Sequence, residues 1–130
     1  MYKLLTNKWT AVTWTVVIFL LLGLNNEHVP EVGMFKFKFR DKIYHCIVFA
    51  VYAFLWFGVG YRNTMINLIK LFLTVFITGL ILGIGMEFFQ ESFTNRQFSW
   101  WDGFADMIGL LLGLGIAKKS PYGNRGRNQN

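Results

Sequence analysis

The residues of this chain that could do chemistry form three short groups of acidic, basic and amide side chains. Asp41 and His45 stand four residues apart, as do Asp102 and Asp106, so each pair shares one face if its segment is helical. Carboxylates beside a histidine can exchange protons, bind a cation or pair with lysine and arginine. The full set of candidate site residues is Asp41, Lys42, His45, Glu87, Gln90, Arg96, Asp102 and Asp106.

Three interpretations of this polar set are open. The first is a buried network of ion pairs and hydrogen bonds that fixes the register of the helices. The second is a pocket for an outer-leaflet lipid or an envelope intermediate. The third is a metal site, since one histidine with several carboxylates suits a hard or borderline cation. No dense His or Cys pattern indicates zinc, however, and we expect neither a metal nor another cofactor.

The segments between these groups have the composition of a membrane protein. Of the 130 residues, 54% are hydrophobic and only 15% are charged, whereas about 25% of the residues in soluble domains are charged. The formal net charge is +6, but the basic residues are scattered between long apolar runs, which excludes nucleic acid as a partner. The expected surroundings are therefore a lipid bilayer. Cys46, the one cysteine, cannot form an internal disulfide.

Four apolar segments are the candidate helices. They cover residues 9–24, 43–61, 68–89 and 98–117. About 20 residues cross the hydrocarbon region, so the last three are long enough, and the first spans only ~24 Å unless flanking lysines extend it. The first segment lacks a small-x-small cleavage site and is read as a retained helix rather than a signal peptide. Because the last two links are short, we predict an all-α, polytopic four-helix bundle with up-down topology.

The placement of basic residues predicts the orientation of this bundle. One side holds eight of the 13 Lys and Arg residues and no acid, and the other holds five with all seven acids. The positive-inside rule then places both termini in the cytoplasm and the polar groups near the outer face. Residues 1–117 form the transmembrane domain, and residues 118–130 are expected to be a disordered, basic cytoplasmic tail.

Two glycine stripes are expected to mediate helix packing. Gly79 and Gly83 lie at helical spacing in the third segment, and Gly109 and Gly113 do so in the fourth. Glycines four residues apart let helix backbones approach closely. Since the two helices run antiparallel, we predict that glycines meet glycines near the middle of the membrane and that carboxylates meet carboxylates near the outer face.

The motifs, read in chain order, resemble those of the VanZ-like family of small bacterial membrane proteins. They are Asp41-Lys42-x-x-His45, Glu87-x-x-Gln90 and Arg96-x-x-Ser99-x-x-Asp102-x-x-Ala105-Asp106-x-x-Gly109-x-x-x-Gly113. One departure is Asp106, where the family pattern more often has Asn. The resemblance implies a multi-pass protein of the cell envelope, whose namesake contributes resistance to the glycopeptide antibiotic teicoplanin. It implies no catalytic residue and no cofactor.

Three functions are compatible with these features. The chain is expected to act in the bacterial cytoplasmic membrane as a binding or accessory protein in the envelope or glycopeptide response. Its ligand would then be a lipid-linked envelope intermediate or a glycopeptide-related molecule. The second function is a membrane enzyme that acts on a lipid-linked or headgroup substrate, with His45 or Glu87 as general acid or base. The third is a purely structural or assembly protein. The oligomeric state is open.

Overall fold

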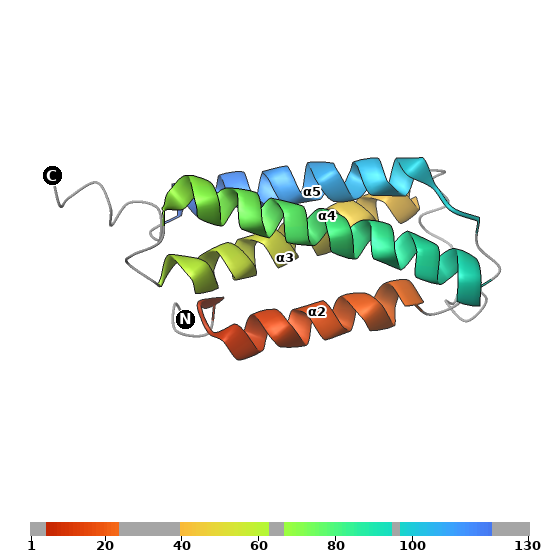
Figure 1. Ribbon diagram of the computed structural model, residues 1–130, viewed down its shortest axis with the longest axis horizontal. Coiled ribbons are helices and arrows are strands. Elements are labelled where there is room, and N and C mark those ends of the chain that lie inside the picture. The colour runs from red at the N-terminus through yellow and green to blue at the C-terminus, as the bar shows by residue number, and fades with distance from the viewer. Residues whose placement is uncertain (1–4, 24–39, 63–66, 95–96, 121–130) are drawn as a thin grey trace, which may run out of the picture.

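The computed structural model describes residues 5–23, 40–62, 67–94 and 97–120. These residues form four α-helices, and the predicted all-α four-helix bundle is confirmed (Figure 1). Successive helices run in opposite directions, so α3 and α5 are parallel to each other (Figure 1). The helices are α2 (Lys8–Gly23), α3 (Arg40–Tyr61), α4 (Leu68–Phe93) and α5 (Trp100–Lys119).

The helices extend further into the polar segments than the hydrophobic pattern predicts. α3 begins at Arg40 rather than at residue 43, and α4 ends at Phe93 rather than at residue 89. An acidic residue in a first turn, such as Asp41, interacts favourably with the positive end of the helix dipole. Polar side chains therefore do not mark the ends of these helices.

α5 is shifted towards the C-terminus relative to the predicted range. It begins at Trp100 rather than at residue 98 and continues through Lys118 and Lys119. Two cations in the last turn stabilise that end of the helix dipole. The prediction that the disordered tail starts at residue 118 was wrong for these two lysines, and residues 121–130 of the predicted tail lie outside the described residues.

Three of the helices are long and apolar enough to cross a membrane. They are α3 from Asp41 onwards, α4 and α5, whereas α2 is a shorter apolar helix of 16 residues. Large apolar side chains on the outside of the bundle, such as Ile69, Ile81 and Ile116, are exposed. An apolar outer surface of this kind is stable in contact with lipid chains rather than with water.

The closest helix contact joins α3 and α5. A Cβ atom added to Gly109 would overlap the backbone of Cys46, and one added to Gly113 would overlap the backbone of Ala50. Two glycines on α5 thus face two small residues on α3 at the same four-residue spacing. Small residues at matching positions allow backbones to pack directly, which favours helix association in membranes.

The predicted contact between the glycines of α4 and those of α5 does not form. A Cβ atom at Gly79 would meet the side chain of Leu110, and one at Gly83 would meet the carboxylate of Asp106. The α4 glycines therefore make room for larger side chains of α5. The prediction was wrong because equal depth in the membrane does not determine how each helix is rotated about its axis.

α2 is attached to α3 by two indole hydrogen bonds. The Nε1–H of Trp14 donates to the carbonyl of Val48 at 3.0 Å, and the Nε1–H of Trp56 donates to Oγ1 of Thr15 at 3.1 Å. Ile18 of α2 is fully buried in the core of the bundle. These contacts hold the shortest helix against the pair formed by α3 and α5.

Substitution of two α5 glycines tests this packing. Gly113→Ala should lower the free energy of unfolding by about 1–3 kcal/mol, because the added methyl group overlaps the α3 backbone. Gly115→Ala is the matched control, since its added Cβ has no atom of another described helix within 4 Å. It should leave stability unchanged or raise it by up to about 1 kcal/mol. Thermal unfolding in detergent micelles measures both, and equal stability of the two variants would contradict the α3–α5 contact.

Candidate polar site at one end of the bundle

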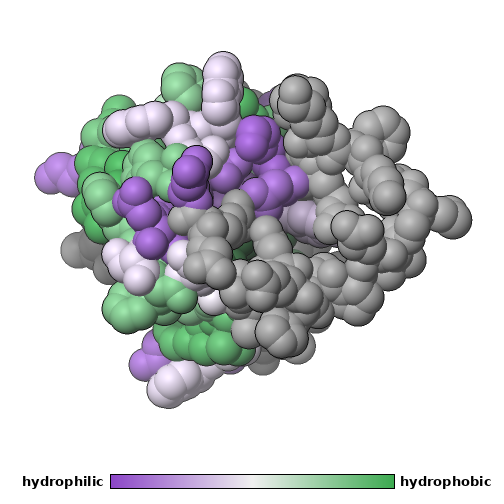
Figure 2. All heavy atoms as spheres, turned by 90° about the vertical axis from the view of Figure 1, so that its right-hand side faces the viewer, coloured by the Kyte–Doolittle hydropathy of each residue, from purple (hydrophilic) through white to green (hydrophobic). Residues whose placement is uncertain are grey.

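The described candidate residues gather at one end of the bundle. Asp41, Lys42 and His45 occupy the first two turns of α3, and Asp102 and Asp106 the first two turns of α5. Because α3 and α5 are parallel, their first turns lie at the same end, shown on the right of Figure 1. Figure 2 looks at this end and shows hydrophilic side chains gathered there. We call these five residues the end cluster; Arg96 lies outside the described residues.

His45 and Asp106 form the innermost contact of the end cluster. Nδ1 of His45 lies 2.9 Å from Oδ1 of Asp106, and their side chains are 0% and 1% exposed. An ionised Asp106 accepts this hydrogen bond from Nδ1–H, which leaves Nε2 of a neutral ring as an acceptor. Within the part of the chain that the structure describes, Nε2 is buried and has no hydrogen-bond partner. The contact therefore fixes the orientation of the ring, and in the neutral tautomer protonated at Nδ1 the Nε2 atom carries a lone pair that no described residue uses.

Lys42 and Asp102 form a second contact nearer the end of the bundle. Nζ of Lys42 lies 2.9 Å from Oδ1 of Asp102, and the side chains are 29% and 2% exposed respectively. The lysine stem covers apolar surface while its ammonium group reaches the buried carboxylate. This ion pair compensates one of the charges that α5 carries into the bundle.

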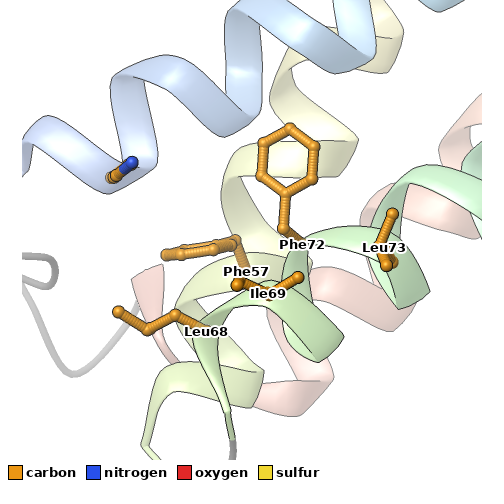
Figure 3. A pocket seen from close by; sticks show the side chains of 6 residues that line it. Phe57, Leu68, Ile69, Phe72 and Leu73 are labelled. Carbon is orange, nitrogen blue, oxygen red and sulfur yellow. The ribbon is translucent and has the colours of Figure 1, made fainter.

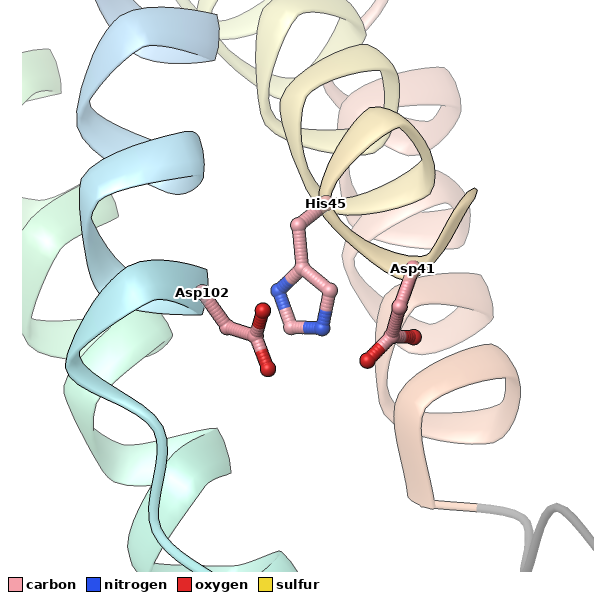
Figure 4. Close-up of side chains that lie close together, drawn as sticks. All are labelled: Asp41, His45 and Asp102. Carbon is pink, nitrogen blue, oxygen red and sulfur yellow. The ribbon is translucent and has the colours of Figure 1, made fainter. Parts of the chain in front are cut away.

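Asp41, His45 and Asp102 converge on one point. One potential ligand atom from each residue can be chosen so that all three atoms lie within 4.8 Å of one another. Figure 4 shows the imidazole of His45 between the carboxylate of Asp102 and that of Asp41. This arrangement brings two carboxylates to a histidine that a third carboxylate orients.

Gly83 of α4 makes room for the buried carboxylate of Asp106. A Cβ atom at Gly83 would lie 2.6 Å from Oδ2 of Asp106. The spacing of the glycines in the sequence predicted only a helix-packing role for Gly83, and its contact with the polar site was not predicted. The available signal was the position of Gly83 one turn before Glu87, on the same face of the helix.

Glu87 and Gln90 of α4 bind backbone groups near the end cluster. Oε2 of Glu87 accepts a hydrogen bond of 2.9 Å from the backbone N–H of Ser99, the residue that precedes α5. Nε2 of Gln90 donates a hydrogen bond of 2.6 Å to the carbonyl of Leu22 in the last turn of α2. Both side chains are buried. They position the start of α5 and the end of α2 relative to α4.

A separate cavity of about 340 Å³ lies at the opposite end of the bundle (Figure 3). Its walls come from the end of α3, the start of α4 and the end of α5, and they are almost entirely apolar. Such a surface suits a hydrocarbon chain and offers few groups for polar recognition. Sequence reasoning did not anticipate this cavity, whose lining residues are Phe57, Leu68, Ile69, Phe72, Leu73 and Lys118.

The contact between His45 and Asp106 can be tested by a double-mutant cycle. His45→Ala and Asp106→Ala should each lower the free energy of unfolding by about 1–3 kcal/mol, because each leaves a buried polar partner unsatisfied. The double variant should lose less free energy of unfolding than the sum of the two single losses, with a coupling energy of about 0.5–3 kcal/mol. The cycle of Lys42→Ala and Asp102→Ala serves as a comparison and should show a smaller coupling, since Lys42 is partly exposed to solvent. Additive losses for His45 and Asp106 would contradict the buried contact.

Comparison of the chain with protein-family models, curated proteins and solved structures found no match. The chain itself shows a helical bundle with three helices able to span a membrane and, at one of its ends, a polar cluster in which His45, Asp102 and Asp106 are buried.

Proposed function

We propose that this chain is a multi-pass protein of the bacterial cytoplasmic membrane, a member of the VanZ-like family that its motifs resemble. In this proposal it is a binding or accessory protein of the cell envelope. The end cluster binds the polar part of its ligand, a lipid-linked envelope intermediate or a glycopeptide-related molecule.

The observation that carries the proposal is the Nε2 atom of His45, which is buried and has no hydrogen-bond partner among the described residues. A network that only fixed helix register would be expected to pair its buried polar atoms. An unsatisfied buried acceptor costs about 1–3 kcal/mol. Oδ2 of Asp106 and Oε1 of Gln90 also lack hydrogen-bond partners among the described residues. Three buried acceptors at one end of the bundle are better explained by a site that receives a ligand.

The distribution of charge supports an outward orientation of the end cluster. Among the described residues, Lys8, Arg62, Lys70, Lys118 and Lys119 all lie at the opposite end of the helices. Under the positive-inside rule that end faces the cytoplasm. The end cluster then faces the outer leaflet, where lipid-linked intermediates and glycopeptides are encountered.

The proposal predicts a loss of function when the end cluster is altered. In a strain lacking this protein, His45→Gln and Asp102→Ala should fail to restore the wild-type susceptibility to teicoplanin. The wild-type chain and Glu91→Gln should restore it, since Glu91 is an exposed carboxylate at the same end. Minimum inhibitory concentrations measure the effect, and membrane immunoblots confirm that each variant accumulates. Full restoration by both cluster variants would refute a role for the cluster in this response.

The pair formed by His45 and Asp106 also favours a second candidate, a membrane enzyme acting on a lipid-linked or headgroup substrate. A carboxylate on Nδ1 orients a histidine so that Nε2 can take a proton from a substrate hydroxyl or water. Hydrolysis or group transfer near the outer leaflet would follow from such a base.

Profiling of lipids and peptidoglycan precursors distinguishes the two candidates. If the chain is an enzyme, a deletion strain should accumulate its substrate, and the wild-type chain but not His45→Gln should reverse the change. The binding proposal predicts the same lipid and precursor profile in the deletion and wild-type strains. An unchanged profile would therefore exclude the enzyme as the explanation of the phenotype.

A further inference from the structure

The convergence of Asp41, His45 and Asp102 has the composition of a metal-ligand set. One nitrogen and two carboxylate oxygens are contributed by two helices, and these atoms lie within 4.8 Å of one another (Figure 4). We propose that these three residues hold a divalent transition-metal cation, with Nε2 of His45 as its nitrogen ligand. The inference deepens the proposed function and rests on the end cluster being a binding site, for which it names a ligand.

The orientation of His45 is the first argument for a cation. A histidine that binds a metal through one ring nitrogen almost always donates the other N–H to a carboxylate or carbonyl. Asp106 occupies this position, 2.9 Å from Nδ1. Nε2 is then the atom left to bind a metal, and it is buried without a hydrogen-bond partner among the described residues. The side chain of His45 is 0% exposed, so bulk water does not replace that partner.

The charge of the end cluster is the second argument. Asp41, Asp102 and Asp106 contribute three carboxylates, whereas Lys42 contributes one positive charge. With a neutral His45, the formal charge of these side chains is two negative units. Carboxylates inside a membrane span are costly unless they are compensated. A divalent cation would bring the formal charge of the cluster to zero.

The donor types favour Zn²⁺ or Mn²⁺ over Mg²⁺ or Ca²⁺. Imidazole nitrogen is a common ligand of zinc and other first-row metals, while Mg²⁺ and Ca²⁺ take oxygen ligands. Zinc sites with three protein ligands leave a fourth position for water or a bound molecule. The geometry thus resembles an open site rather than a closed structural one.

The ligand atoms need only a small movement to reach a metal. Ligands in a tetrahedral zinc site are ~2.1 Å from the ion and therefore about 3.4 Å apart. The 4.8 Å limit holds for one ring nitrogen of His45 and one oxygen of each carboxylate, so atoms at that limit would have to approach one another by about 1.4 Å. Asp41 lies in the first turn of α3 and is only half-buried, whereas His45 and Asp102 are buried, so its side chain is the least enclosed of the three.

The sequence alone led to the expectation that no metal is bound. Asp41 and His45 are close in sequence, but Asp102 lies on another helix about 60 residues later. No spacing pattern connects these three residues. The ligand set becomes visible only when α3 and α5 are placed side by side.

Metal titration of the full chain tests the proposal. The protein is purified in detergent, stripped with a chelator and titrated separately with ZnCl₂ and MnCl₂ by isothermal titration calorimetry. We expect saturable binding of one ion per chain for at least one metal. Asp41→Ala and His45→Gln should each weaken that binding at least about tenfold. Asp41→Ala alters a half-buried residue at the start of a helix, so it tests the site even where His45→Gln impairs folding.

Glu91→Gln is the matched control, because it removes an exposed carboxylate from the same end of the bundle and should bind the ion as tightly as the wild type. The absence of saturable binding of both ions would overturn the proposal. So would wild-type affinity in both cluster variants, since the metal would then be bound elsewhere. Binding is measured without reference to antibiotic susceptibility. A cation site without an effect on susceptibility would therefore refute only the proposed function, whereas an effect without cation binding would refute only this inference.

Discussion

The structure depends on the close approach of the α3 and α5 backbones. Gly109 and Gly113 on α5 lack the Cβ atoms that would collide with Cys46 and Ala50 on α3. The attraction between apolar helices in lipid comes from such direct packing rather than from the hydrophobic effect. Because the two helices are parallel, the same approach that joins their middles also brings their first turns together. Asp106, the partner of His45, lies three residues before Gly109 on α5, and His45 directly precedes Cys46 on α3.

The end cluster is a consequence of that approach. It also lowers the stability of the bundle, because it carries charged groups into the membrane span. Each carboxylate carried into a membrane span costs a few kcal/mol on insertion scales. The ammonium group of Lys42 compensates the negative charge of Asp102, and His45 forms a hydrogen bond with Asp106. What remains is a concentration of negative charge around an oriented imidazole. A cation, or a positively charged group of a ligand, that enters this region gains electrostatic energy that a network fully paired within the protein would not offer.

α4 and α2 surround the central pair and position its end. Glu87 accepts a hydrogen bond from Ser99 at the start of α5, and Gln90 donates one to Leu22 at the end of α2. These residues belong to the same polar level as the end cluster, yet their bonds go to backbone groups. Among the described residues of the predicted polar set, those of the end cluster meet between α3 and α5, whereas Glu87 and Gln90 bind backbone groups of neighbouring helices.

The sequence was enough to predict the four apolar helices that the structure describes and the end of the bundle at which the described polar residues gather. The lengths of the apolar segments and of the short links between them are local properties of the sequence, so they can be recognised without a structure. Which helix faces meet depends on how the helices pack against one another in three dimensions. A stripe at four-residue spacing sets the depth of each residue but not the rotation of the helix or its partner, and so the α5 glycines were assigned to α4 instead of α3. The convergence of Asp41, His45 and Asp102 was hidden for the same reason, because it depends on contacts between helices that are not neighbours in the chain.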